Sequence, residues 1–370
     1  MNKVMELEAL DTLFFRDGKP FSMGDESWAD GVFPPFPSVI YGALRTGYFA
    51  EDIKRFRDIG HETKSAELAI VNIFYKINSS IYYPMPLDLV EITEKGEENK
   101  WLEKMRLETR FDILRQNSSL QVLGFQSEDE NQAIETLENC LINSMDLQTY
   151  LSGQNDDELR YADYERIENM VLSEPKVGIG LNKFSGSAYD GQLYRIGMRR
   201  LDSKSGRLNI GVSCKFDDLE TIPKMIRLGG EGKSARCFAI EDAKVIKDIK
   251  IPQPTLSGTS FKLYLSTPAI FKHDWKPSWM KENGYFDYRG IRMRLKAATV
   301  GKPCYIGGFD MKNKCPKKMQ KAAPAGSVYY LELEDVGDGE KIPGLFHNKS
   351  ISEMNEFVKQ GFGITFVGEV

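Results

Sequence analysis

Histidine is scarce in this sequence. The 370 residues include three, His61, His273 and His347, and none lies in a Ser/His/Asp or HxxxH context. A metal-independent ribonuclease usually needs a histidine as its general base. The sequence therefore predicts a protein that is not an enzyme, and its histidines are expected to be surface or helix-capping residues.

Paired cysteines and long apolar runs are also lacking. The five cysteines are scattered and form no CxxC pair, which argues against a structural zinc site and favours reduced thiols in the cytoplasm. No run approaches the roughly 18 apolar residues of a membrane span, and Met1–Leu10 has no apolar segment typical of a signal peptide. Asp25, Glu26 and Asp30 are a weak metal candidate, so we expect no metal and no cofactor.

Positive charge is not in excess overall, because the formal net charge is −5. The charges are unevenly distributed, since the block from Asp88 to Glu168 contains 20 acidic and 8 basic residues, a net of −12, which leaves +7 on the remainder. The acidic block is either a solvated helical insertion or a surface that avoids RNA and faces a protein partner. Both interpretations leave a basic surface elsewhere that can bind nucleic acid.

Two segments each read as a helix that runs into a glycine cluster and then an apolar strand. They are Leu219–Ile240, with Gly229, Gly230 and Gly232, and Ile351–Val370, with Gly361 and Gly363. Glycines leave the backbone N–H groups of such a turn uncovered, which suits contact with a sugar-phosphate backbone. The repetition indicates a duplicated nucleic-acid-binding fold.

Further features recur in the same order in both halves and support this duplication. They are a Leu-x-Thr strand (Leu10–Thr12, Leu265–Thr267), an Ile-Gly turn (Ile179–Gly180, Ile306–Gly307) and a Gly-x-aliphatic-Tyr strand (Gly191–Tyr194, Gly326–Tyr329). The unit reads strand–helix–strand–strand–helix–strand, the ferredoxin-like pattern of RNA recognition motifs. The predicted fold class is α+β, with two tandem ferredoxin-like domains and a helical acidic insertion in the first.

Proline and glycine between residues 251 and 258 predict a domain boundary. We expect an N-terminal domain at 1–250, with its insertion at about 78–174, and a C-terminal domain at 259–370. Ser38 follows three prolines and is expected to cap a helix that runs to about Arg57, with Arg45 off its apolar face.

The sequence Gly-Gly-Glu-Gly-Lys-Ser at 229–234 invites comparison with a phosphate-binding P-loop. The comparison fails, because such a loop needs a glycine where Arg227 stands and a strand–loop–helix order. A helix C-cap is the simplest structural explanation for the glycines. Lys233 and Arg236 beside an uncovered backbone nevertheless favour contact with phosphates.

Two other basic segments have open roles. Arg16 and Lys19 flank an Asp-Gly turn, which is either an ordinary turn with a charge pair or a second place of RNA contact. The lysine-rich stretch Met311–Lys321 is expected to be an insertion of the second domain, and its function stays open.

Four segments and the closing glycine turn together carry the pattern of a known family. They are Leu10–Phe21, Phe36–Arg45, Val177–Asn182, Leu228–Gly232 and Gly361–Gly363. In these segments the chain resembles the third subunit of the Cmr (type III-B) CRISPR effector complex, a member of the RAMP superfamily. The resemblance implies two ferredoxin-like domains without catalytic activity, which hold the 5′ repeat-derived tag of the guide RNA. It also implies contacts with the large polymerase-like subunit and with the backbone RAMP subunit.

The residues expected to bind RNA combine basic side chains with glycine-turn amides. They are Arg16, Lys19, Arg45, Lys183, Gly229, Gly230, Gly232, Lys233, Arg236, Gly361 and Gly363. Two alternatives stay open: a RAMP-type endoribonuclease that processes guide RNA, and an assembly subunit that never touches RNA.

Overall fold

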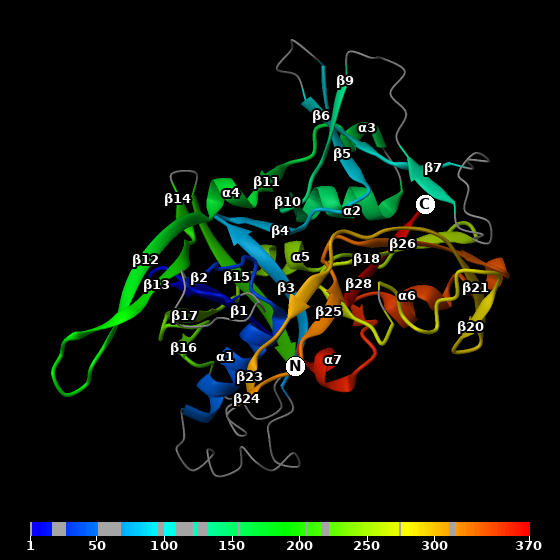
Figure 1. Ribbon diagram of the computed structural model, residues 1–370. Coiled ribbons are helices and arrows are strands. Elements are labelled where there is room, and N and C mark those ends of the chain that lie inside the picture. The colour runs from blue at the N-terminus through cyan, green and yellow to red at the C-terminus, as the bar shows by residue number, and fades with distance from the viewer. Residues whose placement is uncertain are drawn as a thin grey trace.

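The computed structural model describes residues 2–16, 27–50, 68–94, 100–108, 121–124, 132–153, 156–203, 206–215, 222–273, 275–310 and 315–370. These residues form a mixed α/β, strand-rich architecture with several antiparallel sheets (Figure 1). Within the described ranges, no helix is long and apolar enough to cross a membrane.

The first half of the chain builds the larger sheet. Its central strands, in spatial order, are β3 (Ala69–Ile77), β15 (Gly206–Lys215), β1 (Asn2–Ala9) and β17 (Ser234–Ala239). The sheet extends beyond β3 through β4 (Ser80–Pro84), β10 (Cys140–Asn143) and β11 (Tyr164–Arg166), and beyond β17 to β16 (Met225–Arg227), while β14 (Asp202–Ser203) pairs with β15.

Helix α1 (Pro37–Ala50) packs on this sheet against β3 and β16. Its buried Ile40, Leu44 and Tyr48 recur at helical spacing and join a core with Met5 and Leu7 of β1. The predicted helix is thus confirmed as far as Ala50, and its expected end near Arg57 lies outside the described residues. The helix begins at Pro37, so Ser38 lies in its first turn and the expected cap at Ser38 is wrong, because proline is well suited to the first helical position.

The second half builds a separate sheet with its own core. Its central strands, in spatial order, are β21 (Ile291–Thr299), β26 (Val328–Leu333), β18 (Ser260–Leu265) and β28 (Ile364–Glu369), flanked by β20 (Phe286–Tyr288) and β27 (Lys349–Ser350). The turn η2 (Val336–Asp338) and helices α6 (Lys341–Phe346) and α7 (Asn355–Lys359) lie between β26 and β28. In both sheets the four central strands follow the order second, third, first, fourth by chain position.

The acidic block forms mainly strands, so the expectation of a helical insertion is wrong for its described part. A small sheet contains β6 (Lys100–Lys104), β5 (Leu89–Glu94) and β9 (Gln132–Thr136), and β7 (Arg106–Glu108) pairs with β8 (Val122–Gly124). The helices α2 (Ser144–Ser152), α3 (Asp156–Leu159) and α4 (Ile167–Met170) are short. The β-branched and apolar residues of β5 favour a strand whatever the surrounding net charge.

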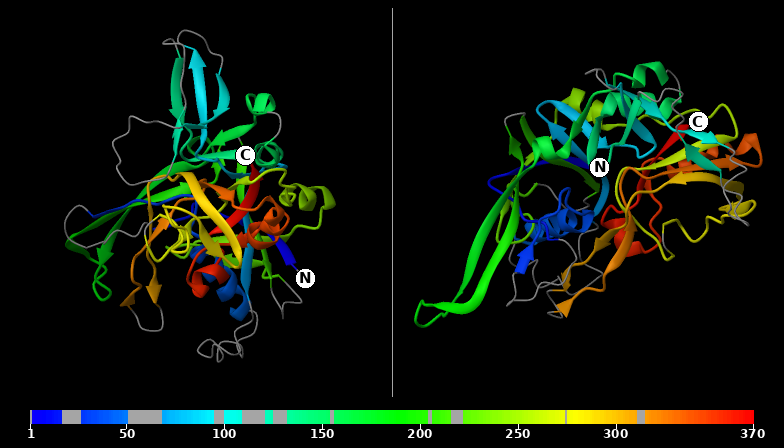
Figure 2. Two further views of the ribbon diagram at one scale, coloured as in Figure 1. Left: turned by 90° about the vertical axis from the view of Figure 1, so that its right-hand side faces the viewer. Right: turned by 45° about the horizontal axis from the view of Figure 1, so that its top comes forward.

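Two hairpins project from the sheets. The first pairs β12 (Leu172–Leu181) with β13 (Ala188–Arg200), which also pairs with β2 (Ser27–Ala29). The second contains β22 (Cys304–Ile306), β23 (Phe309–Asp310), β24 (Cys315–Pro316) and β25 (Gln320–Ala323), with β19 (Ala269–Ile270) beside β25. Each hairpin lies between the second and third central strands of its half, and both project toward the same side of the molecule (Figure 2).

A third core joins the two halves, with Tyr83 from β4 packed edge-on against Phe366 from β28 at 5.6 Å between ring centroids. The Tyr83 hydroxyl donates to the carbonyl of Ile249, at the end of α5 (Ala243–Ile249), over 2.8 Å. Nε2 of His347 lies 2.9 Å from the carbonyl of Ile251. The segment between the sheets is therefore held by both halves.

A buried polar cluster fastens the acidic block to the second sheet. Asp88 is fully buried and accepts hydrogen bonds from the hydroxyls of Tyr150 in α2, at 2.7 Å, and of Tyr330 in β26. Lys262 of β18 is also fully buried, and its Nζ donates to the Tyr150 carbonyl over 2.7 Å. Satisfied polar groups of this kind specify one arrangement of the parts they join.

Candidate nucleic-acid interface

The first glycine turn connects two strands. Residues 229–232 join β16 to β17, and Ile226 of β16 pairs with Ala235 of β17. The prediction of a helix before these glycines is therefore wrong where the chain is described, and the glycines do not form a helix C-cap. The segment pairs with β17 at the sheet edge, and this pairing overrides the helical spacing of its apolar residues.

This turn is exposed and packs against the segment that follows β1. The Gly230 N–H donates to the Phe14 carbonyl over 2.8 Å. Gly229 has φ +82°, and a Cβ there would lie 2.4 Å from the same carbonyl oxygen, so a side chain does not fit. The fold thus brings together two segments singled out in the sequence, the Gly229–Gly232 turn and the strand end before Arg16.

Lys233 ends this turn and is already paired. Its Nζ lies 2.7 Å from Oδ2 of Asp11, and the hydrogen bond from Lys233 lowers the pKa of Asp11 to about 2. Asp11 also lies 3.5 Å from Arg200 and 3.9 Å from Lys176. A phosphate at this place would compete with the Asp11 carboxylate for three cations.

Lys176 and Arg200 are the basic residues that the sequence analysis missed. They lie on β12 and β13, and both also pair with Glu174, at 3.7 Å and 2.6 Å. We call the five residues at the base of the first hairpin the base cluster. It contains three cations, Lys176, Arg200 and Lys233, and two carboxylates, Asp11 and Glu174. Sequence spacing carried little signal, because Asp11 and Lys176 meet only through the tertiary fold.

Arg236 is the third residue of β17 and is exposed. Its Nη1 is 3.8 Å from Oε2 of Glu8 on the neighbouring strand, and its guanidinium lies 5.5 Å from the Phe238 ring centroid. Its side chain is half exposed. It therefore extends the basic surface that begins at Lys233.

The remaining predicted basic residues are spread out. Arg16 is exposed and forms a backbone bridge with Gly31, whereas Arg45 is partly buried on α1, with its guanidinium 5.6 Å from the Phe49 ring. Lys183 is exposed in the turn at the far end of the first hairpin, and Lys19 lies outside the described residues. The fold brings Arg16 near the glycine turn and leaves Lys183 remote from it.

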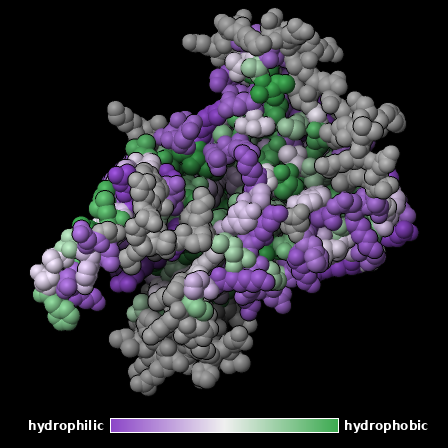
Figure 3. Space-filling view, in the orientation of Figure 1, coloured by the Kyte–Doolittle hydropathy of each residue, from purple (hydrophilic) through white to green (hydrophobic). Residues whose placement is uncertain are grey.

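The first hairpin exposes apolar side chains along its length. Val177, Ile179 and Leu181 are 62%, 46% and 57% exposed, and Phe184 at its end is fully exposed. Hydrophobic residues are visible along this arm in Figure 3. Tyr189 on the second strand is also exposed. An exposed apolar surface of this kind is typical of a binding surface.

The second glycine turn differs, because it is buried. The Gly361 N–H donates to the Val358 carbonyl over 3.1 Å, and the Gly363 N–H donates to the Pro268 carbonyl over 2.7 Å. The expectation of uncovered amides is wrong for this turn, although the predicted helix, glycine turn and strand are all present as α7, 361–363 and β28. RNA contact by Gly361 and Gly363 stays a prediction that no exposed amide supports.

The predicted repeat is also corrected in two details. Gly191 lies within β13 of the first hairpin, whereas Gly326 precedes β26 of the second sheet, so these glycines are not equivalent. Ile179 and Gly180 lie inside strand β12, so the expected turn there is wrong, whereas Ile306 ends β22 before Gly307.

The two described histidines lie in different environments. His347 is buried, its Nδ1 accepts from the Val367 N–H at 3.2 Å, and burial lowers its pKa. It follows α6 as its C-cap residue, as a capping role predicts, but it is not on the surface. His273 is exposed, and His61 lies outside the described residues. Across the described ranges, no group of His, Cys, Asp and Glu is arranged to hold a metal.

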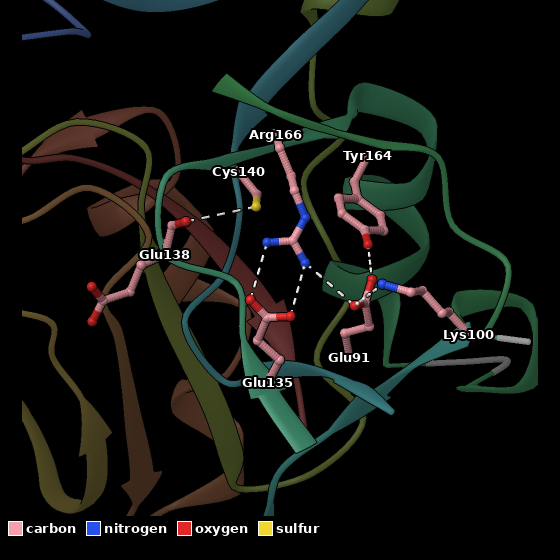
Figure 4. Close-up of polar contacts among 7 residues, drawn as sticks. All are labelled: Glu91, Lys100, Glu135, Glu138, Cys140, Tyr164 and Arg166. Atoms are coloured by element: carbon pink, nitrogen blue, oxygen red, sulfur yellow. Dashed lines mark hydrogen bonds and ion pairs between the residues drawn. The ribbon is translucent and has the colours of Figure 1, made fainter. Parts of the chain in front are cut away.

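A second charged cluster lies in the acidic block and has a structural role (Figure 4). Glu91 of β5 is buried and accepts from Lys100 at 2.9 Å, from Arg166 at 3.3 Å and from the Tyr164 hydroxyl. Burial alone raises the pKa of Glu91, but the hydrogen bonds from Tyr164 and Lys100 outweigh it and lower the pKa. Arg166 also reaches Glu135 of β9 at 3.1 Å. The cluster fastens the small sheet to β11.

Comparison with known proteins gives one match over almost the whole chain. A family model described as CRISPR-associated protein (Cas_Cmr3) matches residues 5–370. No curated protein matches.

Several solved structures match this chain, each with a TM-score below 0.5. A chain of the type III-B Cmr-beta complex bound to cognate target RNA and AMPPnP (state 1) is 17% identical, with 89% of this chain and 86% of that chain covered and a TM-score of 0.48. A second Cmr-beta structure, bound to cognate target RNA, is 16% identical, with coverage of 92% and 89% and a TM-score of 0.46. A chain of the type III-A Csm3-Csm4 subcomplex is 12% identical, with coverage of 90% and 93% and a TM-score of 0.39.

Proposed function

The chain belongs to the Cas_Cmr3 family, as a RAMP-type subunit of the type III-B Cmr effector complex, and from this premise we propose that it binds the 5′ repeat-derived tag of the guide RNA without cutting it. The observation that carries the proposal is the meeting of the exposed Gly229–Gly232 turn, the strand end before Arg16 and the base cluster. A phosphate backbone needs such a combination of cations and an approachable main chain.

Phosphates are proposed to lie over Lys233 and Arg236, with Lys176, Arg200 and Arg16 close by. Each cation of the base cluster has a carboxylate neighbour, so RNA binding exchanges internal ion pairs for phosphate contacts. The affinity for RNA therefore depends on the salt concentration, because the bound RNA strand also releases its counterions.

Bases are proposed to stack on the exposed aromatic side chains of the first hairpin. Phe184 and Tyr189 lie on the same arm as the exposed Lys183. Base–aromatic stacking is tolerant of sequence and works on single strands whose bases are splayed. The hairpin would therefore hold tag nucleotides that continue past the base cluster.

We further propose that the two sheets are tandem ferredoxin-like domains at 1–250 and 259–370. The support is their shared order of four antiparallel central strands, which the split βαβ pattern produces. In this proposal the two domains together bridge the large polymerase-like subunit and the backbone RAMP subunit. The exposed acidic residues of the block at 78–174 face a protein partner.

The competing function is a guide-processing endoribonuclease, and the same purified chain tests it. Cleavage of repeat RNA that disappears in His61→Ala or His273→Ala would establish the enzyme. His347 is a poor general base, because both of its ring nitrogens are engaged inside the fold. We propose that the chain has no catalytic activity.

The proposal is tested by tag-RNA binding as a function of salt. Loss of one phosphate contact lowers the slope of log K against log salt by about 0.7 for a single strand. We expect this change in Lys233→Ala and in Arg236→Ala, whereas Lys281→Ala, an exposed lysine of the second half, leaves the slope unchanged. Unchanged slopes in both of the first two variants would remove the glycine turn from the site.

A further inference from the structure

A cavity of about 460 Å³ opens between the two halves of the molecule. Its walls come from residues 32–37 before α1, from β3 and the end of β4, from the turn before β10, and from the second half at residues 266–268 and on the second hairpin. The described residues that line it include no charged side chain. Its size and apolar walls are those of a ligand site, and no RNA contact proposed above uses it.

One wall of the cavity carries a hydroxyl that lacks a partner. Tyr75 on β3 is 5% exposed and lines the cavity beside Phe33, with 6.2 Å between the two ring centroids. Among the described residues, its hydroxyl has no hydrogen bond. A tyrosine hydroxyl can both donate and accept a hydrogen bond, so an occupant with a backbone or side-chain hydrogen-bonding group can pair with it there.

The rim on the side of the second hairpin is basic. Tyr305 of β22 lines the cavity and pairs with Lys321 of β25, and paired side chains of antiparallel strands lie on the same face. Met319, two residues before Lys321, also lines the cavity. Lys317 and Lys318 precede it and are exposed. Positive charge therefore borders the apolar opening at this end.

Exposed carboxylates neighbour lining residues of the first half in sequence. Glu138 is exposed between two residues that line the cavity, and Glu168 is exposed directly after Ile167, which also lines it. A nucleic-acid strand laid across the opening would bring phosphates against these carboxylates. An apolar peptide with an acidic residue at one end matches both the interior and the basic rim.

We propose that this cavity is a docking site for a segment of another protein subunit, with apolar side chains inside the cavity and an acidic residue beside Lys318 and Lys321. The Tyr75 hydroxyl supplies a hydrogen bond to that segment. The inference rests on the bridging part of the proposed function and not on its RNA contacts. It assigns the lysine-rich hairpin to protein recognition.

The test is photocrosslinking in the assembled ribonucleoprotein complex, with p-benzoylphenylalanine replacing Tyr305. Tyr305 is 56% exposed and borders the opening, so an aromatic replacement is tolerated. We expect a crosslink to another subunit, mapped to an apolar stretch that contains an acidic residue. A crosslink to RNA, a crosslink confined to this chain, or no crosslink at all would overturn the proposal.

Three variants in the same complex measure the contribution of each part. Met319→Glu and the double variant Lys318→Glu/Lys321→Glu are each expected to lower the crosslink yield about tenfold, and Tyr75→Phe about threefold. Lys281→Glu is the matched control and leaves the yield unchanged. A yield unchanged in all three variants overturns the proposal.

Folding and RNA binding are measured in the same samples. Equal thermal unfolding of variant and parent chains excludes misfolding as the cause of a lost crosslink. If the variant complexes retain tag RNA, RNA binding is separate from docking in the cavity. Absence of the parent chain from the purified complex would instead contradict the bridging function itself.

Discussion

The two glycine turns of this molecule have similar sequences and opposite environments. Gly229–Gly232 is exposed at the foot of the first hairpin, whereas Gly361 and Gly363 are buried where the second half meets the first, with Gly361 against Ile70 of β3. In the first turn the absence of side chains leaves a surface accessible. In the second it allows two parts of the fold to approach. The same residue type therefore serves a candidate ligand site in one half and internal packing in the other.

The largest difference between the turns is expected in stability. Gly363 has φ +72°, and a Cβ there would lie 2.5 Å from Oγ of Ser352, whereas Gly232 has φ +65° and open space around it. Gly363→Ala should lower the free energy of unfolding by about 2–3 kcal/mol, and Gly232→Ala by about 1 kcal/mol. Chemical denaturation measures both. Equal losses would mean that the two turns are packed alike.

Removing an aromatic residue from the exposed region should affect binding without affecting stability. Phe184→Ala is expected to weaken tag-RNA binding by about 1–3 kcal/mol, the contribution of one stacked base. The free energy of unfolding should change by less than about 0.5 kcal/mol, because the side chain is fully exposed. Tyr161→Ala, an 85% exposed aromatic elsewhere, is the control. Equal RNA affinity in both variants would exclude the hairpin end from the site.

The buried region should respond to pH. Burial lowers the pKa of His347 from its ordinary value of 6.5, because the interior disfavours the charged ring more than the hydrogen bond to the Ile251 carbonyl favours it. Above pH 6.5 the ring is neutral in both the folded and unfolded chains. Below it the unfolded chain takes up a proton that the folded chain resists, so stability falls.

Denaturation at pH 7.5 and at pH 5.5 checks this prediction, with His347→Gln as the comparison. Glutamine keeps a donor and an acceptor but does not titrate, so the variant should lose less stability between the two values. An identical pH dependence in parent and variant would show that other groups control it.

The smallest change in RNA affinity is expected when the carboxylate that pairs with the cations near the exposed glycine turn is removed. Asp11→Asn removes the carboxylate that pairs with Lys233, Lys176 and Arg200. Because exposed ion pairs contribute about 0.2–1 kcal/mol, tag-RNA affinity at low salt should rise about two- to fivefold. Asp338→Asn, which removes the partner of Lys341 in the second half, is the control. An unchanged affinity would place phosphates away from Asp11.

The sequence pattern predicted those elements whose formation depends mainly on residues close together in the chain. Helix α1 follows from the prolines before it and from apolar residues at helical spacing, and α7, its glycine turn and β28 were expected in that order. The segment before Gly229 was misread, because Ile222 and Ile226 have helical spacing while pairing of β16 with β17 makes a strand. Strand pairing of this kind is a tertiary effect that local propensity does not contain.

The candidate site was predicted in part for the same reason. Lys233, Arg236 and the exposed glycines were identified from their proximity in sequence. Lys176 and Arg200 were missed, since the hairpin brings them to Asp11 from more than 150 residues away. Whether a glycine turn is exposed or buried also depends on what packs over it, which spacing along the chain does not specify.

The segment between the two halves, at Ile249 and Ile251, is hydrogen-bonded to both of them, and this has a mechanical consequence. Tyr83 of the first half and His347 of the second half bind the main chain at Ile249 and Ile251, and the hydrogen bond from Tyr330 to Asp88 adds a further contact between the two halves. A joint fastened in this way resists hinge bending, so the separation between the two projecting hairpins is set by the body of the protein. An elongated molecule that contacts both projecting hairpins therefore contacts them at a constant spacing.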